Sequence, residues 1–200
     1  QERPVFSAGA DLKALNAGMA ASLYTSKGGF AGFVYRDRKK PVIAAVHGYV
    51  MGLATGIMFD SDLIVAEEGT QIQATELARG LGGARHWATM RFRGAAAFGT
   101  EMALTGRSFS AEEAFENGLI NRLAPKGTYL DVAYELAREV DANPPLSVRA
   151  TVRARRWYLA QVLKEAEMMT APYYLYLSED LNEEARAFVE KRQPGPFKAR

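Results

Sequence analysis

The chain contains no cysteine and only two histidines, His47 and His86, among its 200 residues. Without thiols neither a disulfide framework nor a thiolate metal site can form, and two imidazoles argue against a zinc or iron enzyme. An excess of one charge is also missing, because 25 Lys and Arg stand against 23 Asp and Glu. This balance predicts no general affinity for nucleic acid or anionic lipid. The first residues, QERPVFSAGAD, lack the pattern of a signal peptide, so we expect a cytoplasmic protein.

Charge is absent from one long run, residues 41–59, which follows the basic stretch RDRKK and has the length of a membrane span. The β-branched PVIAAV is typical of a strand and HGY of a turn, whereas Gly52 and Gly56 suit either a buried helix or helix pairing in lipid. A second apolar strand pattern, SDLIVA, follows. We therefore favour a β-turn-α-β unit of an α/β fold over a membrane protein.

The second half of the chain shows mainly helical signals. Ser110 and Glu113 have the spacing of a capping box, Gly118 ends that helix, and a short strand closes at Pro125. A further amphipathic helix is predicted over residues 130–140. Helix, strand and helix thus succeed one another without an internal repeat.

Two more helices complete the predicted helical region. Pro145 suits the first turn of a long helix, and a last amphipathic helix is expected after Ser178. Asp180 and Glu183 are candidates for the cap of this last helix, and its apolar side would carry Leu181, Ala185 and Phe188. We predict an α/β core over residues 1–125 and a helical region over residues 126–200.

Four arginines gather early in the predicted long helix: Arg149, Arg153, Arg155 and Arg156. The ordinary interpretation is a solvated helix face. The alternative is a basic surface for RNA or another partner, which would bind in a salt-dependent way.

Two predicted strand-to-helix transitions share one design. FSAGAD turns at Gly9 so that the Ala10 amide can point outward, and in VMGLATG the Leu53 amide lies in the first turn of a helix. Free N–H groups at such positions suit an anionic oxygen. If both amides face one carbonyl they form an oxyanion hole, although small residues before a helix also serve packing alone.

The order of several motifs resembles the crotonase superfamily of enoyl-CoA hydratases and isomerases. The resemblance covers essentially the whole chain, through FSAGADLK, KPVIAAVHGYVMG, SDLIVAEEGTQI, LTGRSFSAEEAFENGLINRLAP and RAFVEKRQPG. It implies a crotonase-like ββα spiral core with a C-terminal helical oligomerisation region. It also implies that further βα units precede the position of VFSAGAD.

For chemistry, the resemblance implies that the amides of Ala10 and Leu53 hold a thioester oxygen while an enolate forms. Hydratases of this family use two glutamates; this chain matches the second at Glu76 and has Gly56 at the first. Water addition is helped by two carboxylates, whereas one suffices to move a proton along an enolate. Asp60, one helical turn after Gly56, is expected to point away.

For binding, the resemblance implies an acyl-CoA thioester, with coenzyme A present only as part of the substrate and no other cofactor or metal. The expected contacts are Ala8, Ala10, Leu12, Lys13 and Leu53, with Phe188 and Lys191 given to a neighbouring subunit. The implied assembly is a homotrimer or hexamer, without nucleic acid or membrane as a partner. Residues 24–33 and the glycine loop, which contains Gly80, Gly82 and Gly83, are expected to shape the acyl pocket.

Together these patterns predict an acyl-CoA lyase or isomerase in which Glu76 is the single acid/base. An isomerase, or a ring-cleaving hydrolase or lyase, is favoured over simple hydration because Gly56 replaces a glutamate. Two alternatives stay open: a conventional enoyl-CoA hydratase, and a non-catalytic homologue that binds a CoA thioester, RNA or a partner protein. His47 is interpreted as a turn residue and His86 as structural.

Overall fold

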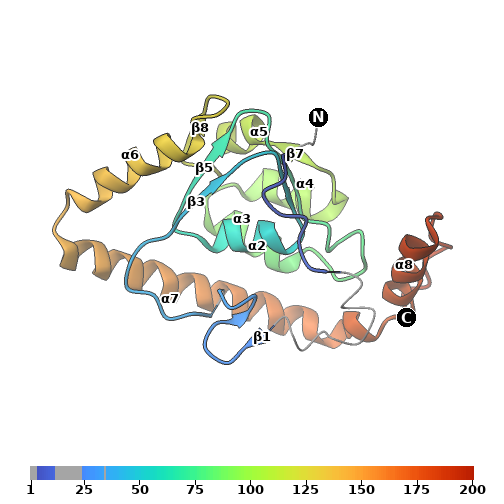
Figure 1. Ribbon diagram of the computed structural model, residues 1–200. Coiled ribbons are helices and arrows are strands. Elements are labelled where there is room, and N and C mark those ends of the chain that lie inside the picture. Colours follow the sequence, from blue (N-terminus) through green and yellow to red (C-terminus); the bar gives the residue numbers. More distant parts are fainter. Residues whose placement is uncertain (1–3, 12–23, 34) are drawn as a thin grey trace.

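The computed structural model describes residues 4–11, 24–33 and 35–200, and Figure 1 shows their arrangement. The strands are β1 (Tyr24–Thr25), β2 (Gly29–Phe30), β3 (Ile43–Val46), β4 (Tyr49–Met51), β5 (Leu63–Glu67), β6 (Gln71–Gln73), β7 (Phe109–Ser110) and β8 (Arg122–Ala124). The helices are α2 (Leu53–Asp60), α3 (Ala84–Phe92), α4 (Ala96–Thr105), α5 (Ala111–Glu116), α6 (Tyr129–Asp141), α7 (Pro145–Thr170) and α8 (Glu179–Glu190). Two single 3-10 turns, η2 (Ala171–Tyr173) and η3 (Leu175–Leu177), connect α7 to α8.

A parallel sheet in the order β3-β5-β8 is apolar on both faces. Because side chains alternate along a strand, Ile64 and Ala66 of β5 face the main core, whereas Leu63 and Val65 face α6. The two-sided burial explains why SDLIVA reads as a continuous apolar run. Helix α2, which connects β4 to β5, packs through Ala54, Met58 and Phe59 into the same main core.

A second small sheet, β4-β6-β7, stands beside the first, with β4 and β6 parallel and β7 antiparallel to β6. The N-terminal segment joins its free edge through a parallel bridge between Ser7 and Val50. The Met51 N–H donates to the Ser7 carbonyl at 3.0 Å, and the Phe6 and Ser7 N–H groups donate to the Tyr49 carbonyl. The strand β4 was not predicted, since HGY was expected to lead directly into a helix.

The helices cover the two sheets, and their ends agree with most of the sequence signals. Ser110 and Glu113 form the predicted capping box, and Pro145 occupies the first turn of α7. In Figure 1, α7 runs along the bottom of the view beneath α2 and α3. Within the described residues, no helix is both long enough and apolar enough to cross a membrane.

The last helix corrects two expectations. Its cap is Ser178, whose hydroxyl accepts from the Leu181 N–H at 3.2 Å, so the proposed cap was wrong. Asp180 instead accepts from the backbone of the C-terminal tail, and Glu183 pairs with Arg192 at 2.6 Å. The predicted apolar face was also wrong, because Ala185 and Phe188 are exposed and the buried residue of α8 is Ala187.

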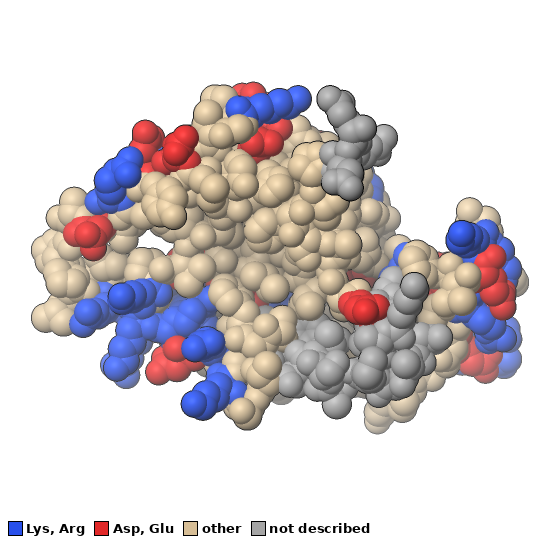
Figure 2. Space-filling view, viewed as in Figure 1, with Lys and Arg blue, Asp and Glu red and all other residues tan. Residues whose placement is uncertain are grey.

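The arginines of α7 divide into two pairs. Arg149 and Arg153 are exposed, and Figure 2 shows basic side chains gathering over the first half of this helix. Arg155 and Arg156 are partly buried and turn toward the core, where the Arg155 guanidinium pairs with Asp62 at 2.9 Å. A solvated face therefore describes only the first pair.

Candidate active site

Three neighbouring segments run parallel and end at one edge of the second sheet. Ser7 lies opposite Val50, and just beyond this pair a methyl group on Gly9 would stand 3.3 Å from the Leu53 nitrogen, so the turn before Ala10 lies beside the start of α2. Met51 of β4 lies opposite Gln73 of β6, so Glu76 follows directly at the same edge. The carboxyl ends of parallel strands are where α/β folds place ligands. Strand pairing and the close approach of Gly9 and Gly52 thus bring the segments of Ala10, Leu53 and Glu76 together, although Ala10 and Glu76 are more than sixty positions apart in the sequence.

Glycines allow the first two segments to approach each other closely. Gly9 has φ +93°, and a methyl group there would stand 2.9 Å from the Met51 carbonyl and 3.3 Å from the Leu53 nitrogen. Gly52 has φ +53° and immediately precedes α2, so Leu53 is its first helical residue. The N–H of a first helical residue has no carbonyl partner within its helix. The Leu53 N–H can therefore donate a hydrogen bond to an external acceptor beside the Gly9–Ala10 turn.

The Glu76 carboxylate lies over this peptide. A methyl group on Gly52 would stand 3.6 Å from Glu76 Oε1 and 2.8 Å from the Thr75 hydroxyl. The Glu76 side chain is 23% exposed, and its Oε2 is buried without a hydrogen-bond partner in the described part of the chain. Burial raises the pKa of Glu76, while its own backbone N–H and the charge of Arg85 oppose the rise. A half-desolvated carboxylate of this kind suits proton transfer.

Two further polar side chains complete the surroundings of Glu76. His86 Nε2 lies 3.0 Å from the Thr55 hydroxyl and 3.8 Å from Glu76 Oε2. The Thr55 hydroxyl is 2.7 Å from the Gly52 carbonyl. Burial, then the charge of Arg85, lowers the pKa of His86 to about 4, so the imidazole is neutral at neutral pH.

Sequence reasoning missed Thr55 altogether and treated His86 as structural. No motif marks Thr55, because the contact of its hydroxyl with His86 forms only when α2 packs against α3. A weak signal existed for His86, which is one of two histidines and follows the glycine loop.

The position of the absent glutamate is open space. A methyl group on Gly56 would meet no described atom within 4 Å. Asp60 does not reach back toward it, as expected, because its carboxylate is buried and pairs with Arg85 at 2.6 Å. Glu76, and not Asp60, is thus the carboxylate beside the start of α2.

The structure describes only some of the residues predicted to contact the CoA group. Ala8 is exposed beside the site, whereas Leu12 and Lys13 lie outside the described residues. The Phe188 ring lies 4.2 Å from the guanidinium of Arg79 in its own chain, three residues after Glu76. Lys191 is exposed at the end of α8 with φ +54°.

Helix α8 thereby approaches the glycine loop. Arg79 also pairs with Glu184 at 3.5 Å, and a methyl group on Gly80 would stand 3.2 Å from the Leu181 backbone. Residues 24–33, expected at the acyl pocket, contain the hairpin β1–β2, which lies near α7 in Figure 1.

The chain resembles known proteins along nearly its whole length. It matches the enoyl-CoA hydratase/isomerase family over residues 2–200. Mevalonyl-coenzyme A hydratase of Aspergillus fumigatus is 36% identical over 94% of this chain and 73% of that protein. Carnitinyl-CoA dehydratase of Salmonella paratyphi A is 34% identical over 94% of this chain and 76% of that protein.

The fold agrees with these sequence matches. The crystal structure of carnitinyl-CoA hydratase from Mycobacterium avium superposes with a TM-score of 0.77 at 34% identity, over 98% of this chain and 77% of that one. The predicted crotonase-like core with a C-terminal helical region is confirmed by this likeness, and the strand ends described above carry the two motifs on which the prediction depended. The chain belongs to the enoyl-CoA hydratase/isomerase family of the crotonase superfamily.

Proposed function

We propose that this protein removes a proton from the carbon next to the carbonyl of an acyl-CoA thioester, with Glu76 as the base. The observation that supports the proposal is the close approach of three segments: methyl groups on Gly9 and Gly52 would stand 3.3 Å from the Leu53 nitrogen and 3.6 Å from Glu76 Oε1, respectively. The electron pair of the broken C–H bond moves into the thioester, and the negative charge develops on its oxygen. The reaction needs no cofactor beyond the CoA carried by the substrate.

The amides of Ala10 and Leu53 are proposed to stabilise that oxygen. Their segments lie within contact distance, since a methyl group on Gly9 would touch the Leu53 nitrogen at 3.3 Å. Donors fixed in advance need no reorganisation as charge develops, and one such donor contributes about 2.7–4 kcal/mol to lowering the barrier. The partial positive charge at the start of α2 acts in the same direction.

Glu76 is proposed to carry the proton in both directions. Its carboxylate is partly desolvated, and burial raises its pKa above the ordinary value, which makes the ionised form a stronger base. Gly56 stands in place of a second carboxylate, with no described atom within 4 Å of a methyl group there, and this favours reactions that one carboxyl can complete. Isomerisation is one of these, because the proton removed from one carbon can return to another.

The names of the relatives favour a second candidate, reversible loss of water from a 3-hydroxyacyl-CoA. In that reaction Glu76 takes the proton next to the carbonyl, the enolate forms, and the C–O bond at carbon 3 then breaks. The leaving hydroxide takes the proton from the Glu76 carboxyl and departs as water. One carboxyl can perform both transfers, and mevalonyl-CoA hydratase and carnitinyl-CoA dehydratase are named for chemistry of this class.

The test follows deuterium uptake into butyryl-CoA in D2O by mass spectrometry, a readout common to both candidates. We expect wild-type exchange and a loss of about 10²- to 10⁴-fold in Glu76→Gln. Glu68→Gln, at an exposed turn, is the matched control and should exchange like the wild type. A panel of 3-enoyl, 2-enoyl and 3-hydroxyacyl thioesters then separates isomerisation from water loss. Undiminished exchange in Glu76→Gln would overturn the assignment of the base.

The assembly is proposed to be a homotrimer or a hexamer. Large apolar side chains are 59–78% exposed at the end of α7 and in the two 3-10 turns: Met168, Met169, Tyr173, Tyr174, Tyr176 and Leu177. Apolar surface of this extent is typical of a covered interface. Sedimentation of the full-length protein should give a mass three or six times that of one chain, and a stable monomer would contradict the proposal.

A further inference from the structure

His86 lies in the interior between two parts of the candidate active site, and the reaction proposed above gives it no role. It is 6% exposed in the first turn of α3. Its Nε2 atom faces the Thr55 hydroxyl at 3.0 Å and Glu76 Oε2 at 3.8 Å. A buried imidazole needs a hydrogen-bond partner, and here the partner belongs to α2.

The positions of the hydrogens follow from the distances. The Thr55 hydroxyl has one hydrogen, and its 2.7 Å contact with the Gly52 carbonyl requires that hydrogen to lie between the two oxygens. The hydroxyl oxygen must then accept from His86, so the imidazole carries its proton on Nε2. Burial keeps the ring neutral, which agrees with a single N–H directed at Thr55.

This chain of hydrogen bonds ends on the peptide that carries the Leu53 amide. The Gly52 carbonyl and the Leu53 N–H belong to one planar trans peptide, so fixing the oxygen fixes the direction of the N–H. The Gly52 carbonyl accepts both the Thr55 hydroxyl and the Thr55 N–H, at 2.7 and 2.8 Å. Hydrogen bonds in series polarise one another, so donation to the oxygen strengthens the N–H on the other side.

The same ring also faces Glu76. At 3.8 Å, Nε2 is too far from Glu76 Oε2 for a hydrogen bond, yet that oxygen is buried and has no hydrogen-bond partner in the described structure. The charged group that acts on both Glu76 and His86 is Arg85 of α3, which forms an ion pair with Asp60 of α2 at 2.6 Å. Arg156, Arg38 and Arg155 also act on Asp60.

We propose that His86 is a positioning residue that aligns the Leu53 amide through Thr55 and supplies a polar neighbour to Glu76. The inference rests on the proposed function, because the Leu53 amide must bind the thioester oxygen. One neutral imidazole then connects the oxyanion donor to the base, and both act in the same proton transfer.

The test compares variants that remove or retain a donor at this place. His86→Leu removes it, and His86→Gln keeps a neutral N–H of similar reach. For deuterium exchange into butyryl-CoA we expect kcat to fall about tenfold in His86→Leu, with KM within about twofold, as for one lost hydrogen bond. His86→Gln should recover to within about threefold of the wild type. The acid limb of the pH–rate profile should move to higher pH in His86→Leu alone, because an apolar neighbour disfavours ionised Glu76.

Thr55 provides an independent check that does not disturb the imidazole site. Thr55→Val removes the hydroxyl at nearly constant volume and should lower kcat about as much as His86→Leu, whereas Thr55→Ser should retain activity. The double variant Thr55→Val/His86→Leu should lose little more than either alone, since both break one chain of contacts.

The outcomes separate this inference from the function on which it rests. If the wild type exchanges deuterium and both His86→Leu and Thr55→Val keep the wild-type kcat, the inference alone is overturned. Equal losses in His86→Leu and His86→Gln with an unmoved acid limb would show a merely structural histidine and would also overturn it. Absence of exchange in the wild type would overturn the proposed function, and the role of His86 with it.

Discussion

The two ends of helix α2 differ in how their backbone groups are hydrogen-bonded. At its start, the Leu53 amide has no carbonyl partner in the helix, Gly52 has φ +53°, and the nearby Glu76 Oε2 is buried without a hydrogen-bond partner in the described residues. At its end, the carbonyls of Phe59 and Ser61 accept from the Arg93 guanidinium at 3.2 and 2.9 Å.

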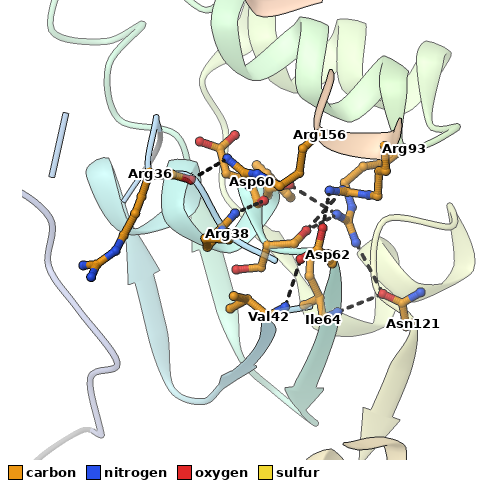
Figure 3. A network of polar contacts seen from close by, with 12 residues as sticks. Arg36, Arg38, Val42, Asp60, Asp62, Ile64, Arg93, Asn121 and Arg156 are labelled. Atoms are coloured by element: carbon orange, nitrogen blue, oxygen red, sulfur yellow. Dashed lines mark hydrogen bonds and ion pairs between the residues drawn. The ribbon is translucent and has the colours of Figure 1, made fainter. Parts of the chain in front are cut away.

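Arginines continue this pattern beyond the helix, as Figure 3 shows. Asp60 pairs with Arg85, Asp62 pairs with Arg155, and Arg93 also donates to the Leu119 carbonyl and to Asn121. Most buried polar groups in proteins are satisfied, and exceptions gather where chemistry occurs. Side chains at the end of α2 are not all satisfied, because Asp60 Oδ1 and two nitrogens of Arg38 are buried without a hydrogen-bond partner in the described residues. The backbone carbonyls are bound there, however, and these bonds anchor the helix while its start, the open end, presents an unpaired amide.

The largest expected effect on stability is at the anchored end. Arg93→Met should lower the free energy of unfolding by about 3 kcal/mol, because buried carbonyls and Asn121 lose a charged donor. Urea unfolding of the full-length protein measures this change. Arg149→Met, at an exposed position of the arginine-rich stretch of α7, is the control and should change stability by no more than about 0.5 kcal/mol. Equal midpoints for the two variants would mean that the anchor contributes nothing.

A smaller loss of stability with a larger effect on chemistry is expected at the open end. Gly9→Ala introduces a methyl group 2.9 Å from the Met51 carbonyl at φ +93° and should destabilise the fold by about 2 kcal/mol. It also separates Ala10 from Leu53, so deuterium exchange should fall about 10²-fold.

Gly94→Ala separates backbone strain from collision. Gly94 has a similar φ, +104°, but a methyl group there meets no described atom within 4 Å. We expect a comparable or smaller loss of stability and unchanged exchange. Exchange at the wild-type rate in Gly9→Ala would show that the approach of the two segments is not needed.

The open end was also the more predictable from the sequence. Glycines before a helix start, and a motif order shared with a known family, indicated Ala10, Leu53 and Glu76 because backbone conformation and short spacings are local properties. The pairing of Ser7 with Val50 joins segments that are distant in the sequence, so it is known only from the structure.

The anchored end could not be predicted in the same way. Arg93 and Arg155 bind carbonyls and carboxylates more than thirty positions away, and nothing in their own neighbourhood marks them as buried. The arginines of α7 have a common spacing, but only the packing of α7 against α3 decides which of them turn inward. The Ser178 cap was missed for a simpler reason, because the acidic residues after it offered competing candidates.

In the middle of α2, a Gly→Ala substitution is expected to stabilise the fold instead of destabilising it. Gly56 has helical backbone, and a methyl group there would meet no described atom within 4 Å, so Gly56→Ala should raise the free energy of unfolding by about 0.5–1 kcal/mol. The control is Gly99→Ala in α4, where a methyl group would lie 2.7 Å from Met90 Cβ and should destabilise. Thermal unfolding distinguishes the two signs, and destabilisation by Gly56→Ala would show that the space is needed by the folded chain.

The smallest effect concerns the ionisation of Glu76 and appears only as a function of pH. Because burial raises the pKa of Glu76 above its ordinary value of 4.5, the folded state holds this proton more tightly than the unfolded state. The wild type therefore loses stability as pH rises from 4.5 through the raised pKa, a loss that Glu76→Gln cannot show. Glu76→Gln should match the wild type below pH 4.5 and be more stable at pH 7, with Glu68→Gln as the control for a lost negative charge. A constant difference between Glu76→Gln and the wild type across this range, measured by urea unfolding at each pH, would mean that folding does not hold the proton at the open end of α2.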